Sequence, residues 1–235
     1  MPGSLVNTRE GRAGQIFVES VAAALGRSVP VIESPALRIV PVPHDPPACS
    51  GDFIFTSRNA IANLRMPFPC IAPAWCVGES TARVAASRGF ADRPVSADVA
   101  RLLRVIAHAA TAKELTYVRG VHVARPILDD LGALGHRVTE CVVYDQITCA
   151  PSKPLLDAVA RGEPLIVPIF SPRSTHFLAD LPKSAPLRVV AMSDRVKAAL
   201  PEHLRKSAAV AVSPDVTSMV TATVALFIGN RPDPV

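Results

Sequence analysis

An internal duplication limits the folds open to this chain of 235 residues more than any other feature. The segment Phe55–Ala60 is similar to Ile169–Ser174, which lies 114 positions later. The same separation relates Val77–Thr81 to Ala191–Arg195. Repeats of about 20–50 residues indicate solenoids, so a repeat of this length predicts two domains of one fold instead.

The duplication continues through the rest of the chain. Three further pairs of similar segments are Pro94–Asp98 with Val212–Asp215, Leu5–Arg9 with Leu115–Arg119, and Ala24–Gly26 with Ala133–Gly135. Five segments of the first half are thus followed by their five counterparts in the same order. This order indicates two homologous halves, each with a strand, a turn and a helix at equivalent places.

Short apolar runs alternate with alanine- and leucine-rich stretches of helical spacing. We expect strands at Ser4–Asn7, Phe53–Phe55, Trp75–Val77, Leu115–Val118, Leu165–Phe170 and Leu187–Ala191. We expect helices at Gln15–Leu25, Ala97–Ala110 and Val216–Ile228. Such alternation is typical of α/β units around parallel sheets, so the predicted fold class is α/β with two similar parallel-sheet domains.

Composition excludes several classes of protein. With 49% hydrophobic residues and a net charge of only +5, the chain is not expected to be disordered. The longest uncharged stretch, Val216–Asn230, is shorter than the ~20 apolar residues of a membrane span. The N-terminus lacks the profile of a signal peptide, from which we expect a cytoplasmic protein.

The basic residues mostly stand singly, and only 5% of residues are aromatic. Neither a basic stripe nor a stacking platform for nucleic acid is indicated. A moderate positive charge fits a small anionic ligand better.

The five cysteines are scattered and form no CxxC motif. We expect all of them to be free thiols in a reducing compartment, with Cys76 and Cys141 as small core residues. The six histidines are also dispersed, so no metal site is expected.

Serine and threonine follow several of the expected strands and precede helices. These residues are Thr56, Ser57, Ser80, Ser171 and Ser193. Each is explained equally well as a helix cap, but the start of a helix also offers free N–H groups to an anion. Ligands of open α/β sheets bind at the carboxyl ends of strands, so the set as a whole favours a binding cleft between two facing domains.

Arginines accompany these turns. Arg9 and Arg119 stand at equivalent places in the two halves, while Arg58 and Arg173 lie within the serine turns. A guanidinium group suits bidentate recognition of carboxylates, although any single arginine is more often a solvated surface residue.

The chain has two tyrosines and no recognisable catalytic motif. Tyr144 ends an apolar run, where its hydroxyl could act as a hydrogen-bond donor or weak acid. Packing of a half-buried aromatic ring at a strand end explains it equally well. A glycine-rich phosphate loop is also missing, which disfavours a nucleotide-binding enzyme.

Five ordered motifs together are similar to the uroporphyrinogen-III synthase family. They are Asp52–Ala60, Val77–Ala82, Phe170–Ser174, Val118–Gly120 followed by Arg125, and Val142–Tyr144. The resemblance extends over nearly the whole chain, from Thr8 and Arg9 to the C-terminal helix.

The resemblance implies a particular division of the chain. Residues 1–35 and 150–235 would form one discontinuous α/β domain, and residues 45–138 would form the other. Residues 36–44 and 139–149 would be crossover linkers, giving two strands between the domains and a ligand cleft. The proline-rich Pro41–Pro47 stretch, together with Pro151 and Pro154, suits extended linkers.

The resemblance also implies an activity. The substrate would be hydroxymethylbilane, a linear tetrapyrrole with four acetates and four propionates. Loss of water and inversion of the D ring through a spiro intermediate would close it to uroporphyrinogen III, without a cofactor. Tyr144 would assist departure of the hydroxyl group, and the expected substrate-binding residues are Thr8, Arg9, Thr56, Ser57, Arg58, Ser80, Thr81, Arg119, Ser171, Arg173 and Ser193.

Two turns depart from the family pattern. Asp194 follows Ser193 and would repel a carboxylate, and Glu10 stands where a proline commonly follows the arginine. The alternative to an enzyme is a non-catalytic two-domain module that binds a small polyanionic ligand. As an enzyme, the protein is expected to be a monomer with no nucleic-acid or membrane partner, in transient contact with hydroxymethylbilane synthase.

Overall fold

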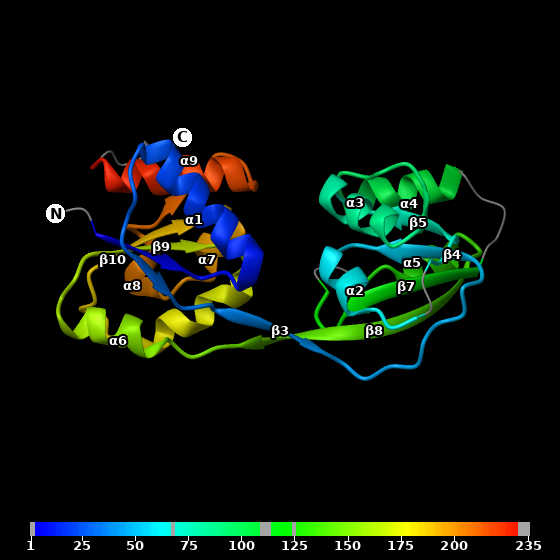
Figure 1. Cartoon of the computed structure of the whole chain (residues 1–235), viewed down its shortest axis with the longest axis horizontal. Coiled ribbons are helices and arrows are strands. Elements are labelled where there is room, and N and C mark those ends of the chain that lie inside the picture. The colour runs from blue at the N-terminus through cyan, green and yellow to red at the C-terminus, as the bar shows by residue number, and fades with distance from the viewer. Residues whose placement is uncertain (1–2, 67–68, 109–113, 124–125, 230–235) are drawn as a thin grey trace. The chain divides into compact units, whose positions relative to one another are not determined.

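The computed structural model describes residues 3–66, 69–108, 114–123 and 126–229, and the chain divides into two compact units (Figure 1). Unit 1 comprises Met1–Arg38 and Ile147–Val235, and unit 2 comprises Ile39–Gln146. The chain therefore passes between the units twice, once after Arg38 and once after Gln146.

Unit 1 contains a parallel five-stranded sheet in the order β11-β10-β9-β1-β2. Its strands are β1 (Ser4–Asn7), β2 (Val31–Glu33), β9 (Leu165–Ile169), β10 (Leu187–Ala191) and β11 (Ala209–Val210). Its helices are α1 (Gly11–Leu25), α6 (Lys153–Ala160), the 3-10 helix η1 (Pro172–Asp180), α7 (Asp194–Ala198), α8 (Glu202–Arg205) and α9 (Val216–Phe227).

Helices cover both faces of this sheet because its strands are apolar on both faces. Successive residues of a strand point to opposite faces, so Leu5 packs in the layer of α1 and α9 while Val6 packs in the layer of α6 and η1. Figure 1 shows α1 and α9 on one side of the sheet and α6 and α8 on the other.

Unit 2 contains a six-stranded sheet in the order β3-β8-β7-β4-β5-β6. Its strands are β3 (Leu37–Pro41), β4 (Asp52–Phe55), β5 (Pro73–Cys76), β6 (Ala91–Asp92), β7 (Glu114–Gly120) and β8 (Arg137–Thr148). Its helices are α2 (Arg58–Asn63), α3 (Glu79–Ser87), α4 (Val99–His108) and α5 (Leu128–Ala133). The α2 and α3 helices pack on one face, around Phe53 and Phe55, and α4 and α5 pack on the other, around Ile54.

Strand β3 runs antiparallel to β8, while the other pairs in unit 2 are parallel. The Val42 N–H donates to the Val143 carbonyl, and the Cys149 N–H donates to the Ala36 carbonyl. From Val42 back to Ala36 on one strand, the partner on the other strand advances from Val143 to Cys149, so the two strands run in opposite directions.

The duplication in sequence is a duplication of sheet topology. Apart from β3, the order β6-β5-β4-β7-β8 in unit 2 repeats the order β11-β10-β9-β1-β2 in unit 1. The expected α/β class with parallel sheets is confirmed, and the strands expected at Ser4–Asn7 and Leu187–Ala191 have those bounds. The helix expected at Ala97–Ala110 is α4, and positions 109–110 lie outside the described residues.

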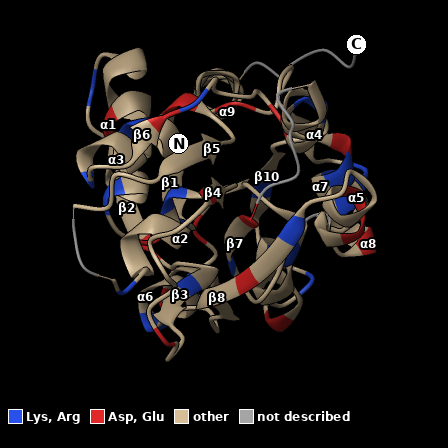
Figure 2. Cartoon of the chain, turned by 90° about the vertical axis from the view of Figure 1, so that its right-hand side faces the viewer, with Lys and Arg blue, Asp and Glu red and all other residues tan. Residues whose placement is uncertain are grey.

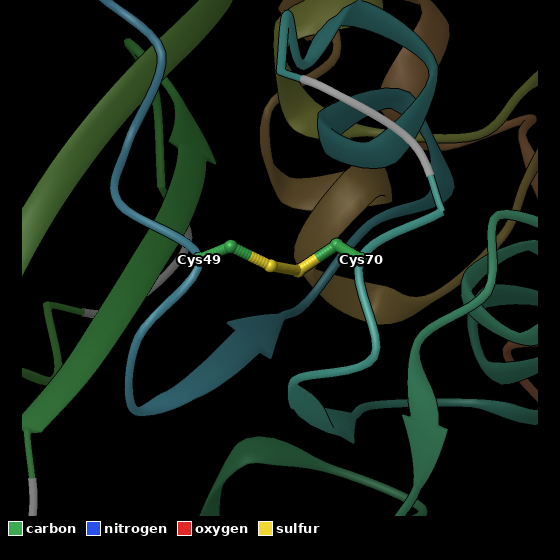
Figure 3. The surroundings of a disulfide bond; sticks show 2 residues. All are labelled: Cys49 and Cys70. Carbon is green, nitrogen blue, oxygen red and sulfur yellow. A yellow bond between two sulfur atoms is a disulfide. The ribbon is translucent and has the colours of Figure 1, made fainter.

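The expectation that every cysteine is a free thiol is wrong. Cys49 and Cys70 form a disulfide, with their Cα atoms 6.2 Å apart (Figure 3). The pairing of β4 with β5 sets Phe53 opposite Ala74, a shift of 21 positions, which is also the separation of the two cysteines. The segments that lead into these neighbouring parallel strands therefore start side by side and bring the two thiols together. Cys76 and Cys141 are buried and free, as expected for core residues.

Charged positions are interspersed over both units. Figure 2 shows Lys and Arg mixed with Asp and Glu along the described ribbon. Within the described ranges, no helix is long and apolar enough to cross a membrane.

Candidate functional site

The carboxyl ends of the central strands carry the turns that the duplication repeats. In unit 2, β4, β5 and β7 are neighbours, so Thr56, Val77 and Gly120 lie along one edge of the sheet. In unit 1, the corresponding edge carries Thr8 after β1 and Phe170 after β9. In sheets of this kind ligands bind at the carboxyl edge, so each of these edges is a candidate site of its own unit.

Tyr144 lies at the unit 2 edge, on β8. The pairing of β7 with β8 shifts by one residue between Arg119 and Gly120, which sets Tyr144 opposite Gly120. The tyrosine ring lies against this glycine and packs in the apolar layer that contains Phe55 and Val118. Its side chain is buried, and its hydroxyl makes no hydrogen bond to another described residue. A buried phenol without a hydrogen-bond partner among the described residues is suited to bind a ligand at this edge.

Thr56 follows β4 at the same edge. Its Oγ1 lies 3.4 Å from the hydroxyl oxygen of Tyr117, which comes from β7 and is also buried. Burial raises the pKa of Tyr117, so this phenol is neutral at physiological pH. We did not expect Tyr117 at the site. Its place depends on the register that sets Tyr117 opposite Ile54, and the local sequence contains no signal for that register.

Arg119 has its donors committed within unit 2. Its guanidinium group forms an ion pair with Glu140 on β8, through Nε and through Nη2, the latter 3.0 Å from Oε2. Nη1 donates to the carbonyls of Gly120 and Val121. The hydrogen bond to Glu140 raises the pKa of Arg119 further. The structure thus gives this predicted binding residue an internal partner that ties β7 to β8.

Three of the predicted serines cap helices. Ser57 accepts a hydrogen bond from the N–H of Asn59, at the start of α2. Ser171 caps η1 and Ser193 caps α7 in the same way, each by accepting from an N–H three residues later. A capping hydroxyl keeps its own proton, which can still be donated to an anion. The Ser171 hydroxyl also lies 2.7 Å from that of Ser174.

The turn before α3 is capped by glycine rather than serine. Gly78 has φ of +82°, a left-handed conformation, and a side chain there would meet nothing within 4 Å. Ser80 is exposed in the first turn of α3, whereas Thr81 is buried. The N–H of Thr81 donates to the Gly78 carbonyl, so the N–H groups of Glu79 and Ser80 are the ones left for a ligand.

Thr8 has an internal partner in unit 1. Its hydroxyl donates to the Pro168 carbonyl at 2.6 Å. Proline has no N–H, and the pairing of β1 with β9 covers only Ser4–Leu165 and Leu5–Ile166. The Thr8 hydroxyl therefore replaces a backbone donor that the strand pair lacks.

The arginines of the repeated turns differ in environment. Arg9 places its guanidinium carbon 4.6 Å from the ring centre of Phe170, an arrangement that attracts a cation to the aromatic face. Arg58 is exposed at the start of α2, and Arg173 lies half-buried in η1. Arg125 lies outside the described residues.

The predicted residues thus fall on two edges. Unit 2 brings together Thr56, Ser57, Arg119 and Tyr144, with Tyr117 added by the structure. Unit 1 brings together Thr8, Arg9, Ser171 and Ser193. Each edge has hydroxyl and N–H groups, with Arg58 exposed in unit 2 and Arg9 at the unit 1 edge, and such groups suit a ligand with carboxylates.

Comparison with known proteins identifies related sequences and folds. The family model described as uroporphyrinogen-III synthase HemD matches residues 19–221. The crystal structure of uroporphyrinogen-III synthetase from Helicobacter pylori 26695 is 14% identical, with a TM-score of 0.66, and the alignment covers 96% of this chain and 100% of that one. A mutant uroporphyrinogen III synthase from the extremely thermophilic bacterium Thermus thermophilus is 17% identical, with a TM-score of 0.51 and coverage of 94% and 96%. No curated protein sequence matches significantly.

Proposed function

Since the chain belongs to the uroporphyrinogen-III synthase family and cyclises hydroxymethylbilane in tetrapyrrole biosynthesis, we propose that Tyr144 at the carboxyl edge of unit 2 assists the first chemical step. The observation that carries this proposal is the environment of its hydroxyl. The ring is fixed between Gly120 and the apolar layer, and the hydroxyl makes no hydrogen bond to another described residue. The apolar surroundings strengthen a hydrogen bond from this donor to a substrate oxygen.

In the proposed step, the Tyr144 O–H donates to the hydroxyl group of hydroxymethylbilane. The C–O bond breaks with its electron pair on oxygen, and the proton from tyrosine completes a water molecule. The azafulvenium cation left behind closes through a spiro intermediate that inverts ring D. The proton released on closure restores the phenol, so the sum is substrate to uroporphyrinogen III plus water.

We propose that the repeated turns hold the carboxylates of the substrate. Ser57, Ser171 and Ser193 accept from the backbone and can donate their own protons outward. The Arg9, Arg58 and Arg173 guanidinium groups and the hydroxyls of Thr56 and Ser80 supply further donors. Thr8 and Arg119 instead stabilise the edges, since their side chains have internal hydrogen-bond partners, and Thr81 does so through its buried side chain.

Catalysis in this proposal consists largely of holding one conformer of the substrate. Closure without inversion gives the type I isomer, so the enzyme must favour the geometry of the spiro route. Fixed donors on rigid strand ends suit that task, because they position carboxylates without taking part in bond changes.

The test is an assay of product isomers. Hydroxymethylbilane is generated in situ, the products are oxidised, and the ratio of type III to type I isomer is measured. We expect mainly type III product with the protein and type I without it. Only type I product at high protein concentration would support a non-catalytic binding module instead.

We further propose a monomer that receives hydroxymethylbilane by transient contact with hydroxymethylbilane synthase. A short transfer reduces the time in which free substrate closes without inversion. For the same reason we propose that the protein works in the compartment where its substrate is made, the cytoplasm. Sedimentation velocity should give the mass of one chain, 24.8 kDa, and coupled assays should show less type I product than assays with added free substrate.

A further inference from the structure

We propose that Tyr117 is a positioning residue, which orients the Thr56 hydroxyl so that its proton is donated to a substrate carboxylate. The inference rests on the proposed contact between Thr56 and substrate, and it adds a residue that no motif of the sequence indicates.

The register of the sheet explains how the two side chains meet. Tyr117 lies opposite Ile54 on the neighbouring strand β4, and Thr56 is two residues beyond Ile54. Residues two apart on a strand share a face, so Ile54, Thr56 and Tyr117 all point toward the layer of α4 and α5. The long tyrosine side chain leans along the strand and reaches the carboxyl edge, where its oxygen lies 3.4 Å from Thr56 Oγ1.

The surroundings of Tyr117 keep its hydroxyl protonated. The side chain is 2% exposed and lies in an apolar layer with Leu115 and Ile127. Burial raises the pKa of the phenol. Two charged groups also act on this pKa: Arg119 lowers it and Glu140 raises it. Arg119 and Glu140 form an ion pair, so their charges largely cancel and do not favour ionisation of the Tyr117 hydroxyl.

The direction of the hydrogen bond follows from the chemistry of the two groups. A phenol is a stronger acid than an aliphatic hydroxyl, so Tyr117 is the better donor and Thr56 the better acceptor. When Thr56 Oγ1 accepts from Tyr117, its own proton is free to point away from the protein. An anionic ligand accepts that proton, and the two hydrogen bonds in series strengthen each other. The 3.4 Å separation is long for such a pair, and we expect it to shorten when an anion accepts the Thr56 proton, because the two hydrogen bonds polarise each other.

Without the Tyr117 hydroxyl, the Thr56 proton has no fixed direction. The threonine hydroxyl can then rotate to donate inward, and a carboxylate at the edge loses a donor. The expected effect is on substrate binding rather than on the chemical step, since Thr56 does not take part in bond changes.

The experiment is a mutant cycle read out by steady-state kinetics of type III product. We expect Tyr117→Phe and Thr56→Val each to raise KM for hydroxymethylbilane about 3- to 10-fold, with kcat changed less than about twofold. The double variant should be no worse than the worse single variant, because both remove one interaction. Thr56→Ser, which keeps a hydroxyl, should stay near the unmodified protein.

The matched control is Thr116→Val, which removes a buried hydroxyl from the adjacent residue of β7, on the opposite face. Its KM should not change. If Tyr117→Phe folds poorly, Tyr117→Met gives a flexible apolar filler without a hydroxyl, and the same KM change is expected.

The outcomes separate the two proposals. If Thr56→Val leaves KM unchanged, the proposed contact of Thr56 with substrate is wrong. Two other outcomes would show that Tyr117 is not a positioning residue. In the first, Thr56→Val raises KM while Tyr117→Phe lowers only the melting temperature. In the second, the two effects on KM multiply in the double variant.

Discussion

The ring of Tyr144 occupies the space that a side chain on Gly120 would need. A Cβ atom at Gly120 would lie 2.6 Å from Cζ and 2.7 Å from Cε2 of the tyrosine, far inside van der Waals contact. The shift in register between β7 and β8 sets these two residues opposite each other. Only glycine at position 120 therefore leaves room for the tyrosine ring, and the ring in turn packs against this glycine.

We predict that Gly120→Ala lowers kcat about 10- to 100-fold, because the added methyl group displaces the Tyr144 ring from its place at the edge. Initial rates of type III formation measure the effect. The control is Gly132→Ala in α5, where a Cβ meets nothing within 4 Å. That variant should keep full activity and gain about 0.5–1 kcal/mol in free energy of unfolding. Equal activity of the two variants would contradict the proposed role of the ring position.

Tyr144→Phe should lower turnover more than it weakens product binding. It removes the hydroxyl and keeps the ring, so packing against Gly120 is preserved. We expect kcat to fall about 100-fold or more, within the range for loss of a general acid, while the Kd of uroporphyrinogen III changes less than about threefold. Unchanged turnover would remove Tyr144 from the mechanism.

Thr8→Val should destabilise unit 1 without a specific effect on substrate binding. The variant leaves the Pro168 carbonyl without the hydroxyl that now donates to it. A loss of about 1–3 kcal/mol in free energy of unfolding is expected from an unsatisfied buried acceptor. Urea unfolding measures the loss, and Thr8→Ser, which keeps the donor, should restore most of it. A raised KM with unchanged stability would show instead that Thr8 contacts the substrate.

Reduction of the Cys49–Cys70 disulfide should lower the free energy of unfolding by about 3 kcal/mol, because the bond closes a loop of 21 residues in the unfolded chain. The loop encloses β4, the Thr56–Arg58 turn and α2, so the turn loses a constraint as well. Urea unfolding with and without a dithiol reductant measures the loss. Cys49→Ser should match the reduced protein, and Cys149→Ser, at a half-buried free cysteine, should not. Equal stability of oxidised and reduced protein would overturn this prediction.

The free thiols should differ in reactivity toward iodoacetamide. Burial raises the pKa of Cys76 to about 12, with a smaller contribution from the Asp92 carboxylate, and burial also raises the pKa of Cys141. In the oxidised native protein at about pH 8, near the ordinary thiol pKa, we expect rapid alkylation of Cys149 alone, detected by peptide mass. Rapid labelling of Cys76 would contradict the structure.

The same pKa shift predicts how stability depends on alkaline pH. The folded state favours the neutral Cys76 thiol, whereas the unfolded chain ionises it near its ordinary pKa of 9.0. The contribution of this thiol is therefore complete below about pH 9 and is lost as pH rises toward about 12. Cys76→Ala should flatten that part of the curve of unfolding free energy against pH.

Local and repeated features of the chain were predictable. The apolar runs at Ser4–Asn7 and Leu187–Ala191 are strands with those bounds, since a short run with both faces apolar suits a covered parallel strand. The serine turns follow their strands as expected, and Ser57, Ser171 and Ser193 cap the helices that come next. The ordered series of five motifs, from Asp52–Ala60 to Phe170–Ser174, indicated the family that the comparison then identified.

Features that depend on strand register were not predictable. The disulfide forms because β4 and β5 pair with a shift of 21 positions, and the local sequence around Cys49 does not predict that shift. Tyr117 reaches Thr56 because β7 pairs with β4 in one register, and Arg119 is committed to Glu140 because β7 also pairs with β8.

By itself, the sequence determined the α/β class, the two similar halves and the turns at the strand ends, because hydrophobic spacing and helix capping are local properties that repeat wherever the residues repeat. Only the tertiary structure decided which donors are left for a ligand. Thr8, Arg119 and Tyr144 lie near the carboxyl edges of the two sheets. Thr8 and Arg119 are held by internal partners, whereas the Tyr144 hydroxyl makes no hydrogen bond to another described residue. The difference arises between strands that are distant in the sequence, where a shift of one residue reverses the face on which each side chain lies.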